Sequence, residues 1–330
     1  MSTESGVNVD ASEPVGRLEM CDDGTGVERL RAARVCLERR SRLISGIRRF
    51  FSGREFVEVE TPVLTRTPAL ETHIDAESAG NGYLRTSPEL FMKRLLAAGY
   101  ERIFEIGPCF RNGEYGPLHN SEYTMLEWYR TPATYRDMME ECRDLICSLF
   151  PAEGDEESIL FRGQTVDLTG QWHVMTISEA FMCFAGWDPV QNYDADRFNL
   201  DLIQKVEPSL PRDRPVFLID YPSAEAALAK LKEDDRLVAE RWELYLGGIE
   251  VANAFTELDD HDEQIRRFQS AAEARDRLGK DVYPVDKRFI DCLKNDFPRA
   301  GGVALGVDRL VMLFCGVDDI HRVRAFDLLR

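Results

Sequence analysis

The segment 110–129 places the strongest constraint on what this chain can fold into. An apolar run over 103–110 ends at Arg111, and a loop with two glycines and a proline follows it. The chain then returns as an alternation of apolar and polar residues over 125–129. Two such runs around a glycine-containing loop predict a long β-hairpin. Arg111 would stand at the end of the first strand, where its guanidinium can donate to two oxygens of a phosphate or a carboxylate.

Composition narrows the classes of function. The net charge of −18 disfavours a broad nucleic-acid surface, because such a surface needs clustered Lys and Arg, although a local basic patch stays compatible with it. The 8 cysteines are scattered without a C-x-x-C pair, so neither a zinc site nor a redox motif is indicated. No apolar run reaches the length of a membrane span and residues 1–12 lack a signal core, which predicts a cytoplasmic protein.

The beginning of the chain differs in composition from the rest. Residues 1–27 are rich in Gly, Ser, Glu and Asp, which predicts a mobile tail. From Glu28 onward apolar residues recur at three- and four-residue steps, so we expect a long amphipathic helix that ends at Gly53. Residues 56–60 then alternate as a short strand before a proline. An ordinary helix-strand unit is one interpretation of this pattern.

Segment 83–96 predicts a short strand, a turn and a helix. Ser87 is placed to cap that helix, with Pro88 at the first helical position and Glu89 in the first turn. Capping chemistry alone would account for these three residues.

The middle and the later parts of the chain carry weaker patterns. Residues 158–214 predict a strand, two short helices and a charged turn, without recognisable chemistry. Apolar spacing predicts helices over 135–149, 262–278 and 285–297, and a buried strand over 216–220.

Segment 242–258 predicts a second hairpin, in which Gly247-Gly248 forms the turn between antiparallel strands. Glu243 and Glu250 lie on either side of that turn, where they can converge on one cation. Two carboxylates suit magnesium, which prefers a few hard oxygens together with phosphate. A solvated acidic face is the alternative interpretation. On the second strand a period of two puts three residues on one face: Asn253, Phe255 and Glu257.

Segment 301–313 is a glycine-rich strand that leads into a helix carrying Arg309 in its first turns. Gly302 and Gly306 would let a planar base or a phosphate approach the backbone. Arg309 can then lie over a purine ring or contact terminal phosphates. Because glycine-rich turns between strand and helix are common, this segment indicates a nucleotide site mainly in combination with the others.

Taken in order, these segments resemble the three motifs of class II aminoacyl-tRNA synthetases: motif 1 over 28–62, motif 2 over 110–129 and motif 3 over 301–313. The Ser-Pro-Glu segment and the amino-acid sequence of motif 2 are similar to those of the lysyl branch. The resemblance covers residues 28–330 and implies one catalytic domain, an α+β fold with an antiparallel sheet flanked by helices, and a homodimer. Since only about 27 residues precede motif 1, too few for a five-stranded anticodon-binding barrel, the chain looks most like the elongation factor P lysine ligases.

This resemblance implies an enzyme that uses ATP and Mg²⁺ to activate lysine, with the β-isomer preferred, as an aminoacyl-adenylate. It also implies transfer of the lysyl group to a lysine side chain of elongation factor P. Two alternatives stay open: a shortened paralogue that acts on tRNA, and a catalytically silent regulatory paralogue. The missing barrel and the acidic balance disfavour tRNA as the acceptor, and the retained Arg111 and Arg309 disfavour the silent paralogue.

The family's site residues carry over to the positions that match its motifs. Arg111 and Arg309 are the expected catalytic residues, and Tyr123 stands where the family usually stacks a phenylalanine on adenine. The expected ATP-binding residues are Arg111, Asn112, Gly113, His119, Asn120, Tyr123, Glu250, Val251, Gly306 and Arg309. The expected lysine-binding residues are Ser87, Pro88, Glu89, Glu127, Tyr129, Asn253, Phe255, Glu257 and Ala304, and the expected magnesium ligands are Glu243 and Glu250.

Two positions depart from the family pattern. Motif 2 usually carries a glutamate where this chain has Gly113, and Glu114 follows, so the adenine contact is expected from the backbone or from Glu114. Motif 3 of the synthetases has a glycine where this chain has Ala304. The added methyl group is expected to influence which lysine isomer fits. Several carboxylates around one cavity suit a substrate with two ammonium groups, because each buried cation needs a partner.

Overall fold

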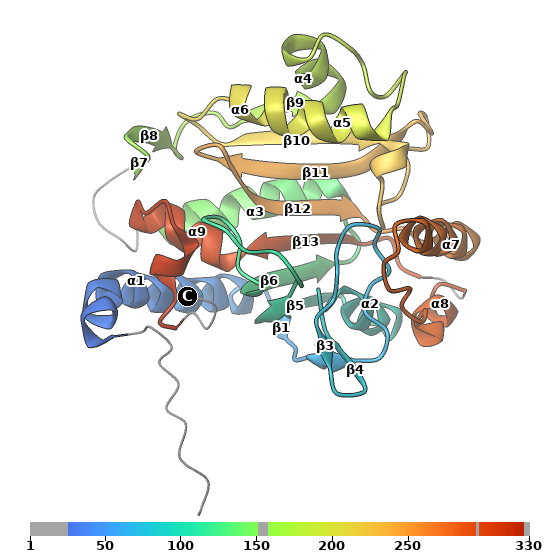
Figure 1. Ribbon diagram of the computed structural model, residues 1–330, viewed down its shortest axis with the longest axis horizontal. Coiled ribbons are helices and arrows are strands. Elements are labelled where there is room, and N and C mark those ends of the chain that lie inside the picture. Colours follow the sequence, from blue (N-terminus) through green and yellow to red (C-terminus); the bar gives the residue numbers. More distant parts are fainter. Residues whose placement is uncertain (1–25, 151–157, 295–296, 327–330) are drawn as a thin grey trace, which may run out of the picture.

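The computed structural model describes residues 26–150, 158–294 and 297–326, so the predicted tail lies outside the described residues except for its last two positions. An eight-stranded sheet forms the centre of this described part, in the order β1-β5-β6-β13-β12-β11-β10-β9 (Figure 1). Its strands are β1 (Val57–Glu58), β5 (Arg102–Phe110), β6 (Glu122–Arg130), β9 (His173–Thr176), β10 (Val216–Pro222), β11 (Val238–Leu246), β12 (Ile249–Thr256) and β13 (Gly301–Gly306).

The sheet is mixed, which corrects the antiparallel prediction at its two edges. The six strands from β5 to β10 pair antiparallel, as expected. At the edges β1 runs parallel to β5 and β9 runs parallel to β10. Parallel neighbours need a long crossover connection. The chain supplies one through β2 (Leu64–Thr65), β3 (Ser78–Ala79), β4 (Gly82–Leu84) and α2 (Glu89–Ala97), and another through the helices of the insertion.

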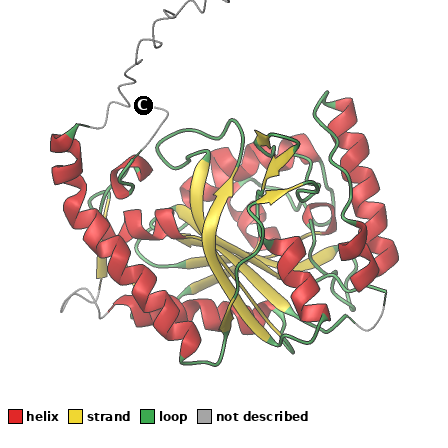
Figure 2. Cartoon of the chain, turned by 90° about the horizontal axis from the view of Figure 1, so that it is seen from below, coloured by secondary structure: helices red, strands yellow, loops and turns green. Residues whose placement is uncertain are grey.

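Helices surround the sheet, as the view from below shows (Figure 2). Apolar residues of α1 (Val27–Ser52), α3 (Tyr135–Leu149) and α9 (Val307–Cys315) build the main core with the sheet, around the fully buried Trp128 and Trp242. A second core joins α2 to α7 (His261–Arg277) and α8 (Lys287–Cys292). In the described residues no helix combines the length and the apolar character that crossing a bilayer requires.

The insertion over 158–214 is more structured than its sequence pattern predicted. It contains the hairpin β7 (Ser158–Phe161) and β8 (Gln164–Asp167), then β9, α4 (Ile177–Phe184), α5 (Ala195–Asp201), the π-helix η2 (Leu202–Val206) and α6 (Glu207–Ser209). These helices share a separate apolar core with β10 and β11, in which the rings of Phe181 and Phe198 stack at 4.9 Å. The elements are short, and their apolar residues pack against residues that are distant in the sequence. The sequence therefore shows little of the periodicity from which helices and strands are predicted.

Two helix boundaries also differ from prediction. The helix expected over 285–297 comprises Lys287–Cys292 in the described residues. Its start is set by Asp286, whose side chain accepts from the backbone of Arg288 at 2.8 Å. Helix α2 begins at Glu89, whose backbone donates to Ser87 Oγ at 2.9 Å, so Pro88 precedes the helix instead of opening it. The short 3-10 helices η3 (Ser223–Glu225) and η4 (Ile320–Val323) complete the elements.

Candidate active site

A cavity of about 250 Å³, here called the first cavity, lies where the motif 2 loop meets β12 and the start of α9. Most of the residues predicted to bind ATP line it. Asn112 and Gly113 do not, because they form an exposed turn after β5, with Gly113 at φ 80°. The predicted residues that line the first cavity are Arg111, His119, Asn120, Tyr123, Glu250, Val251, Gly306 and Arg309.

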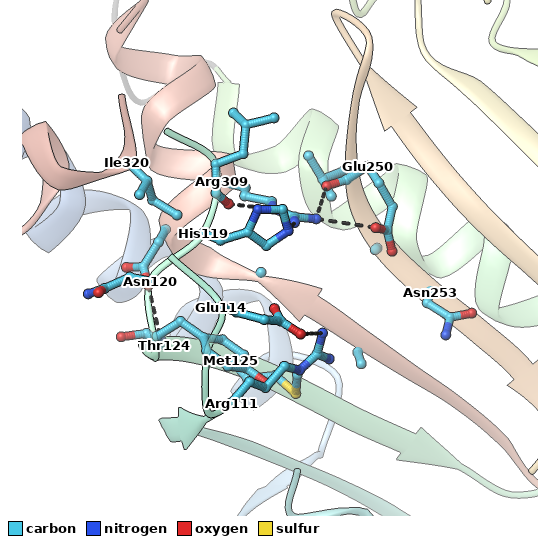
Figure 3. Close-up of a pocket in the computed structure, with 17 residues that line it drawn as sticks. Arg111, Glu114, His119, Asn120, Thr124, Met125, Glu250, Asn253, Arg309 and Ile320 are labelled. Atoms are coloured by element: carbon cyan, nitrogen blue, oxygen red, sulfur yellow. Dashed lines mark hydrogen bonds and ion pairs between the residues drawn. The ribbon is translucent and has the colours of Figure 1, made fainter. Parts of the chain in front are cut away.

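Arg309 stands on one side of the first cavity in a fixed orientation (Figure 3). Its Nη1 donates to the backbone oxygen of Glu250 at 2.8 Å and lies 3.2 Å from the Glu250 carboxylate. Its Nη2 lies 2.8 Å from His119 Nε2. Because a guanidinium can only donate, that imidazole nitrogen must accept, which requires neutral His119. Burial and the Arg309 charge both lower the pKa of His119, in agreement with this assignment.

Arg111 enters the first cavity from the end of β5, as predicted (Figure 3). Its Nη1 lies 3.7 Å from Glu114 Oε1, a loose pair that leaves donors for a ligand. Its guanidinium also lies 5.3 Å from the centre of the Tyr123 ring, whose hydroxyl donates to Thr86 O at 2.9 Å. Gly113 contributes no side chain to the first cavity, and the side chain of Glu114 lines it instead.

Asp308 joins the three motif segments to one another. Its carboxylate accepts from the backbone of Thr124 in β6 at 2.8 Å and pairs with Arg40 of α1. Arg40 in turn donates to Thr124 Oγ1 at 2.7 Å. Asp308 directly precedes Arg309, so these bonds set the position of Arg309 relative to the hairpin that carries Arg111.

A second cavity of about 230 Å³ lies beside the first, and the two share Arg111, Met125, Glu250, Asn253 and Ala304 in their walls. The residues predicted to bind lysine line this second cavity, with the exception of Pro88. They are Ser87, Glu89, Glu127, Tyr129, Asn253, Phe255, Glu257 and Ala304. The predicted face of β12 is thus turned inward, and Asn253 pairs in register with Ala304 of β13, which pairs with Glu127 of β6.

The second cavity holds more buried carboxylates than cations. Lys93 Nζ lies 2.6 Å from Glu89 Oε1 and 2.5 Å from Glu257 Oε2, so one lysine serves two acids. Neither oxygen of Glu257 accepts a well-aligned hydrogen bond from the described residues. Glu127 accepts from Ser87 Oγ at 2.5 Å and from the Tyr129 hydroxyl at 3.1 Å, both of which are neutral donors.

This excess of acid changes the protonation of the cavity. Burial, followed by the Glu89 charge, raises the pKa of Glu127 to about 8. Burial also raises the pKa of Glu257 to about 8, against the lowering effect of Lys93. An ammonium group that entered the cavity would favour the ionised forms and relieve this cost.

Gly302 makes room for the protein's own side chains. A Cβ atom at this position would collide with the Glu257 carboxylate and the Tyr129 ring. At Gly306 an added Cβ would have its nearest contact at 3.7 Å, with Arg309, so this glycine leaves open space at the first cavity. The close approach predicted for Gly302 is therefore made by Glu257 and Tyr129.

Glu243 and Glu250 line the second cavity on adjacent strands. Glu243 accepts from Arg241 at 2.7 Å and from the Tyr245 hydroxyl at 2.9 Å. Burial and the Glu243 charge raise the pKa of Glu250. A divalent cation would offset this repulsion, so the two carboxylates fit magnesium bound together with phosphate oxygens. Within the described residues no group of three or more acidic, His or Cys side chains is arranged to hold a metal without such oxygens.

The chain was compared with known proteins. The model of the family tRNA synthetases class II (D, K and N) matches residues 27–330. The chain is 37% identical over 309 residues to the elongation factor P–(R)-β-lysine ligase of Yersinia enterocolitica, covering 89% of this chain and 95% of that protein. It is 38% identical over 306 residues to the enzyme of that name from Vibrio parahaemolyticus, covering 88% and 94%. The chain belongs to the elongation factor P–(R)-β-lysine ligases of the class II tRNA synthetase family. The ligase of Photorhabdus laumondii is also 37% identical, over 314 residues, and covers 91% of this chain and 97% of its own.

Four side chains in or next to the two cavities were missed by the sequence reasoning. Arg241 lies two residues before Glu243 on β11, so the period of two would have placed both on one face. Lys93 lies one helical turn after Glu89, a spacing that signals contact. Glu207, in the insertion thought to carry no chemistry, lies 3.2 Å from the Tyr245 hydroxyl oxygen, and burial and the Glu243 charge raise the pKa of Glu207 to about 7. Glu71 had no sequence signal.

Proposed function

We propose that this ligase activates a lysine isomer with ATP as an aminoacyl-adenylate and transfers the lysyl group to a lysine side chain of elongation factor P. The observation that carries the proposal is the second cavity, where Glu89, Glu127 and Glu257 are buried and Lys93 pairs with only two of them, Glu89 and Glu257. Such a cavity favours a small substrate with more than one ammonium group. It opens beside the first cavity at Arg111.

In the activation step the amino-acid carboxylate attacks the α-phosphorus of ATP and pyrophosphate leaves. Arg111 is placed at the junction of the two cavities, where its guanidinium can hold both the carboxylate and the α-phosphate. Negative charge grows on these oxygens in the transition state, so donors already oriented there lower the barrier. Arg309 is held by Glu250 and His119 on the other side, where it can bind the far end of the nucleotide.

Glu243 and Glu250 would hold magnesium in this scheme. The ion would neutralise charge on the phosphate oxygens. The chain's own contribution is to orient the two carboxylates, Glu243 through Arg241 and Tyr245, and Glu250 through Arg309.

Lysine recognition follows from how the acids are distributed. Glu127, Tyr129 and Glu257 meet around Gly302, and they suit the side-chain ammonium. Ala304 lies two residues beyond Gly302 along β13, beside Asn253, in the part of the wall that the second cavity shares with the first. Its methyl group would crowd an α-amine, which favours the β-isomer that the names of the relatives print.

The same proposal includes the expected homodimer, with the helix α1 of motif 1 at the interface, and a cytoplasmic setting, because elongation factor P acts there in translation. Sedimentation of the purified protein tests the first of these. A monomer at micromolar concentration would contradict it.

The central test is an acceptor assay with radiolabelled α-lysine and β-lysine, ATP and magnesium. Elongation factor P and total tRNA are offered in separate reactions. We expect label on the protein, with β-lysine used better. Label in acid-precipitable tRNA with none on elongation factor P would favour the tRNA paralogue, and no adenylate with either isomer would favour the silent one.

A further inference from the structure

A third hollow, here called the outer groove, lies next to the second cavity and has a volume of about 820 Å³. Its walls come mainly from the loop over 70–74, the segment 223–228, one side of α7 and part of α5. Six residues line both hollows, so the outer groove adjoins the second cavity. They are Glu71, Ile74, Ala227, Leu228, Arg241 and Asn253.

Glu71 is the one carboxylate among these six shared residues. In the described part of the chain its carboxylate has no hydrogen-bond or ion-pair partner. Burial, followed by the Glu89 charge, raises the pKa of Glu71 to about 7, although Arg111, Arg241 and Lys93 act in the opposite direction. The carboxylate therefore exchanges between its two protonation states near neutral pH, at the point where the outer groove meets the second cavity.

The backbone that carries Glu71 is firmly held. The fully buried Arg275 donates to the backbone oxygens of Glu71 and Ile74, both at 2.8 Å, and to the Asp75 carboxylate at 2.8 Å. The Asp75 backbone oxygen accepts from the backbone N–H of Asn112 at 2.7 Å. This last bond ties the loop to motif 2 immediately after Arg111. Because this backbone is held in place, the Glu71 side chain stays within a fixed distance of the reacting groups, as acid-base catalysis requires.

The other carboxylates of the second cavity are already engaged. Each of them meets a donor or a cation from the described residues: Glu89 and Glu257 meet Lys93, Glu127 meets Ser87 and Tyr129, Glu243 meets Arg241 and Tyr245, and Glu250 meets Arg309.

We propose that Glu71 is the general base of the transfer step, and that the acceptor amine reaches it through the outer groove. This inference rests on the proposed function. The acceptor's ε-ammonium gives one proton to the Glu71 carboxylate and becomes a neutral amine. The nitrogen attacks the acyl carbon of the adenylate, a C–N bond forms, and the bond from that carbon to the phosphate oxygen breaks. AMP leaves with the bonding electrons, and the second ammonium proton passes to the departing phosphate or to water.

The test separates the two half-reactions in Glu71→Gln. Adenylate formation is measured by pyrophosphate exchange, and transfer is measured in a single turnover from preformed β-lysyl-adenylate to elongation factor P. We expect exchange within about twofold of the wild type and transfer at least about a hundredfold slower, since general bases typically contribute 10²–10⁴-fold. Intact exchange also shows that the variant is folded.

Glu140→Gln is the matched control, because Glu140 is exposed on α3 and lies outside both the outer groove and the second cavity. It makes the same change of charge and should transfer at the wild-type rate. Glu71→Asp keeps a carboxylate and should recover part of the transfer rate. The wild-type transfer rate should rise with pH and level off above about 7, where Glu71 is ionised. In Glu71→Gln this plateau should be missing, and the rate should keep rising with the neutral fraction of the acceptor amine. The charges that face Glu71 are those of Glu89 and Lys93 from α2, Arg111 from the end of β5 and Arg241 from β11.

Three results would overturn the assignment. Normal transfer in Glu71→Gln would remove Glu71 from the reaction. Impaired exchange with a raised KM for lysine would make Glu71 a residue of amino-acid binding. A wild-type enzyme that forms adenylate but labels only tRNA would refute the proposed function, and with it this role. The wild-type arm therefore distinguishes that failure from a failure of Glu71.

Discussion

The first and second cavities share a wall but are built on opposite principles. The first is formed by the motif 2 loop and the start of α9, and it presents the cations Arg111 and Arg309 to an anionic ligand. The second is formed mainly by side chains on strand faces, and it presents buried carboxylates to a cationic ligand. The two charge patterns meet at Arg111 and Glu250, which line both cavities. A reaction that joins a phosphate ester to a diamino acid needs this juxtaposition.

The strongest test of the comparison removes the cation at the junction. Arg111→Ala should reduce pyrophosphate exchange at least about a hundredfold, because a charge contact made in the transition state is lost. Arg277→Ala, whose side chain is 71% exposed and lies outside both cavities, is the control and should retain full exchange. Undiminished exchange in Arg111→Ala would remove the assignment of Arg111.

The next test concerns the second cavity alone. Glu127→Gln keeps the size of the side chain but cannot take on the negative charge that pairs with a bound ammonium. The KM for lysine should therefore rise about thirtyfold or more, the cost of leaving a buried ammonium without its partner. The KM for ATP should stay within about twofold. Glu140→Gln, on the exposed side of α3, provides the control. An equal rise in the KM for lysine and the KM for ATP would show that the second cavity does not bind lysine separately from ATP.

A smaller change tests the choice of isomer. Ala304→Gly removes one methyl group beside Asn253, and the use of α-lysine relative to β-lysine should improve about tenfold, within the usual range for one methyl group in a pocket. The ratio of kcat/KM values for the two isomers measures this. An unchanged ratio would show that another residue sets specificity.

The smallest expected effect is on the pH dependence of lysine binding. Glu127 and Glu257 have pKa values raised to about 8, so they are largely protonated at pH 7 and ionise as pH rises. A substrate ammonium, which stays charged in this range, binds the ionised forms, so the KM for lysine should fall severalfold, up to about tenfold per proton released, between pH 7 and 9. The KM for ATP serves as the internal control. A KM for lysine that rises over this range would contradict the raised pKa values.

The sequence by itself determined the elements that carry the main site residues. The hairpin around Arg111, the strands around Glu243 and Glu250, and the strand-to-helix segment with Arg309 were all predicted and confirmed. Periodicity and turn residues are local properties, so they survive in the linear chain. The inward face of β12 was predictable for the same reason, since successive side chains of a strand alternate.

Only the tertiary structure decided how the charges are shared. The contact of Lys93 with Glu257 joins α2 to the end of β12, and no local pattern couples these two residues. Glu71 lies in an irregular loop whose position depends on Arg275 of α7 and on the amide of Asn112. The parallel edges of the sheet likewise depend on crossovers through separate elements. Burial and long-range pairing set the pKa of each carboxylate, and both exist only once distant segments have met.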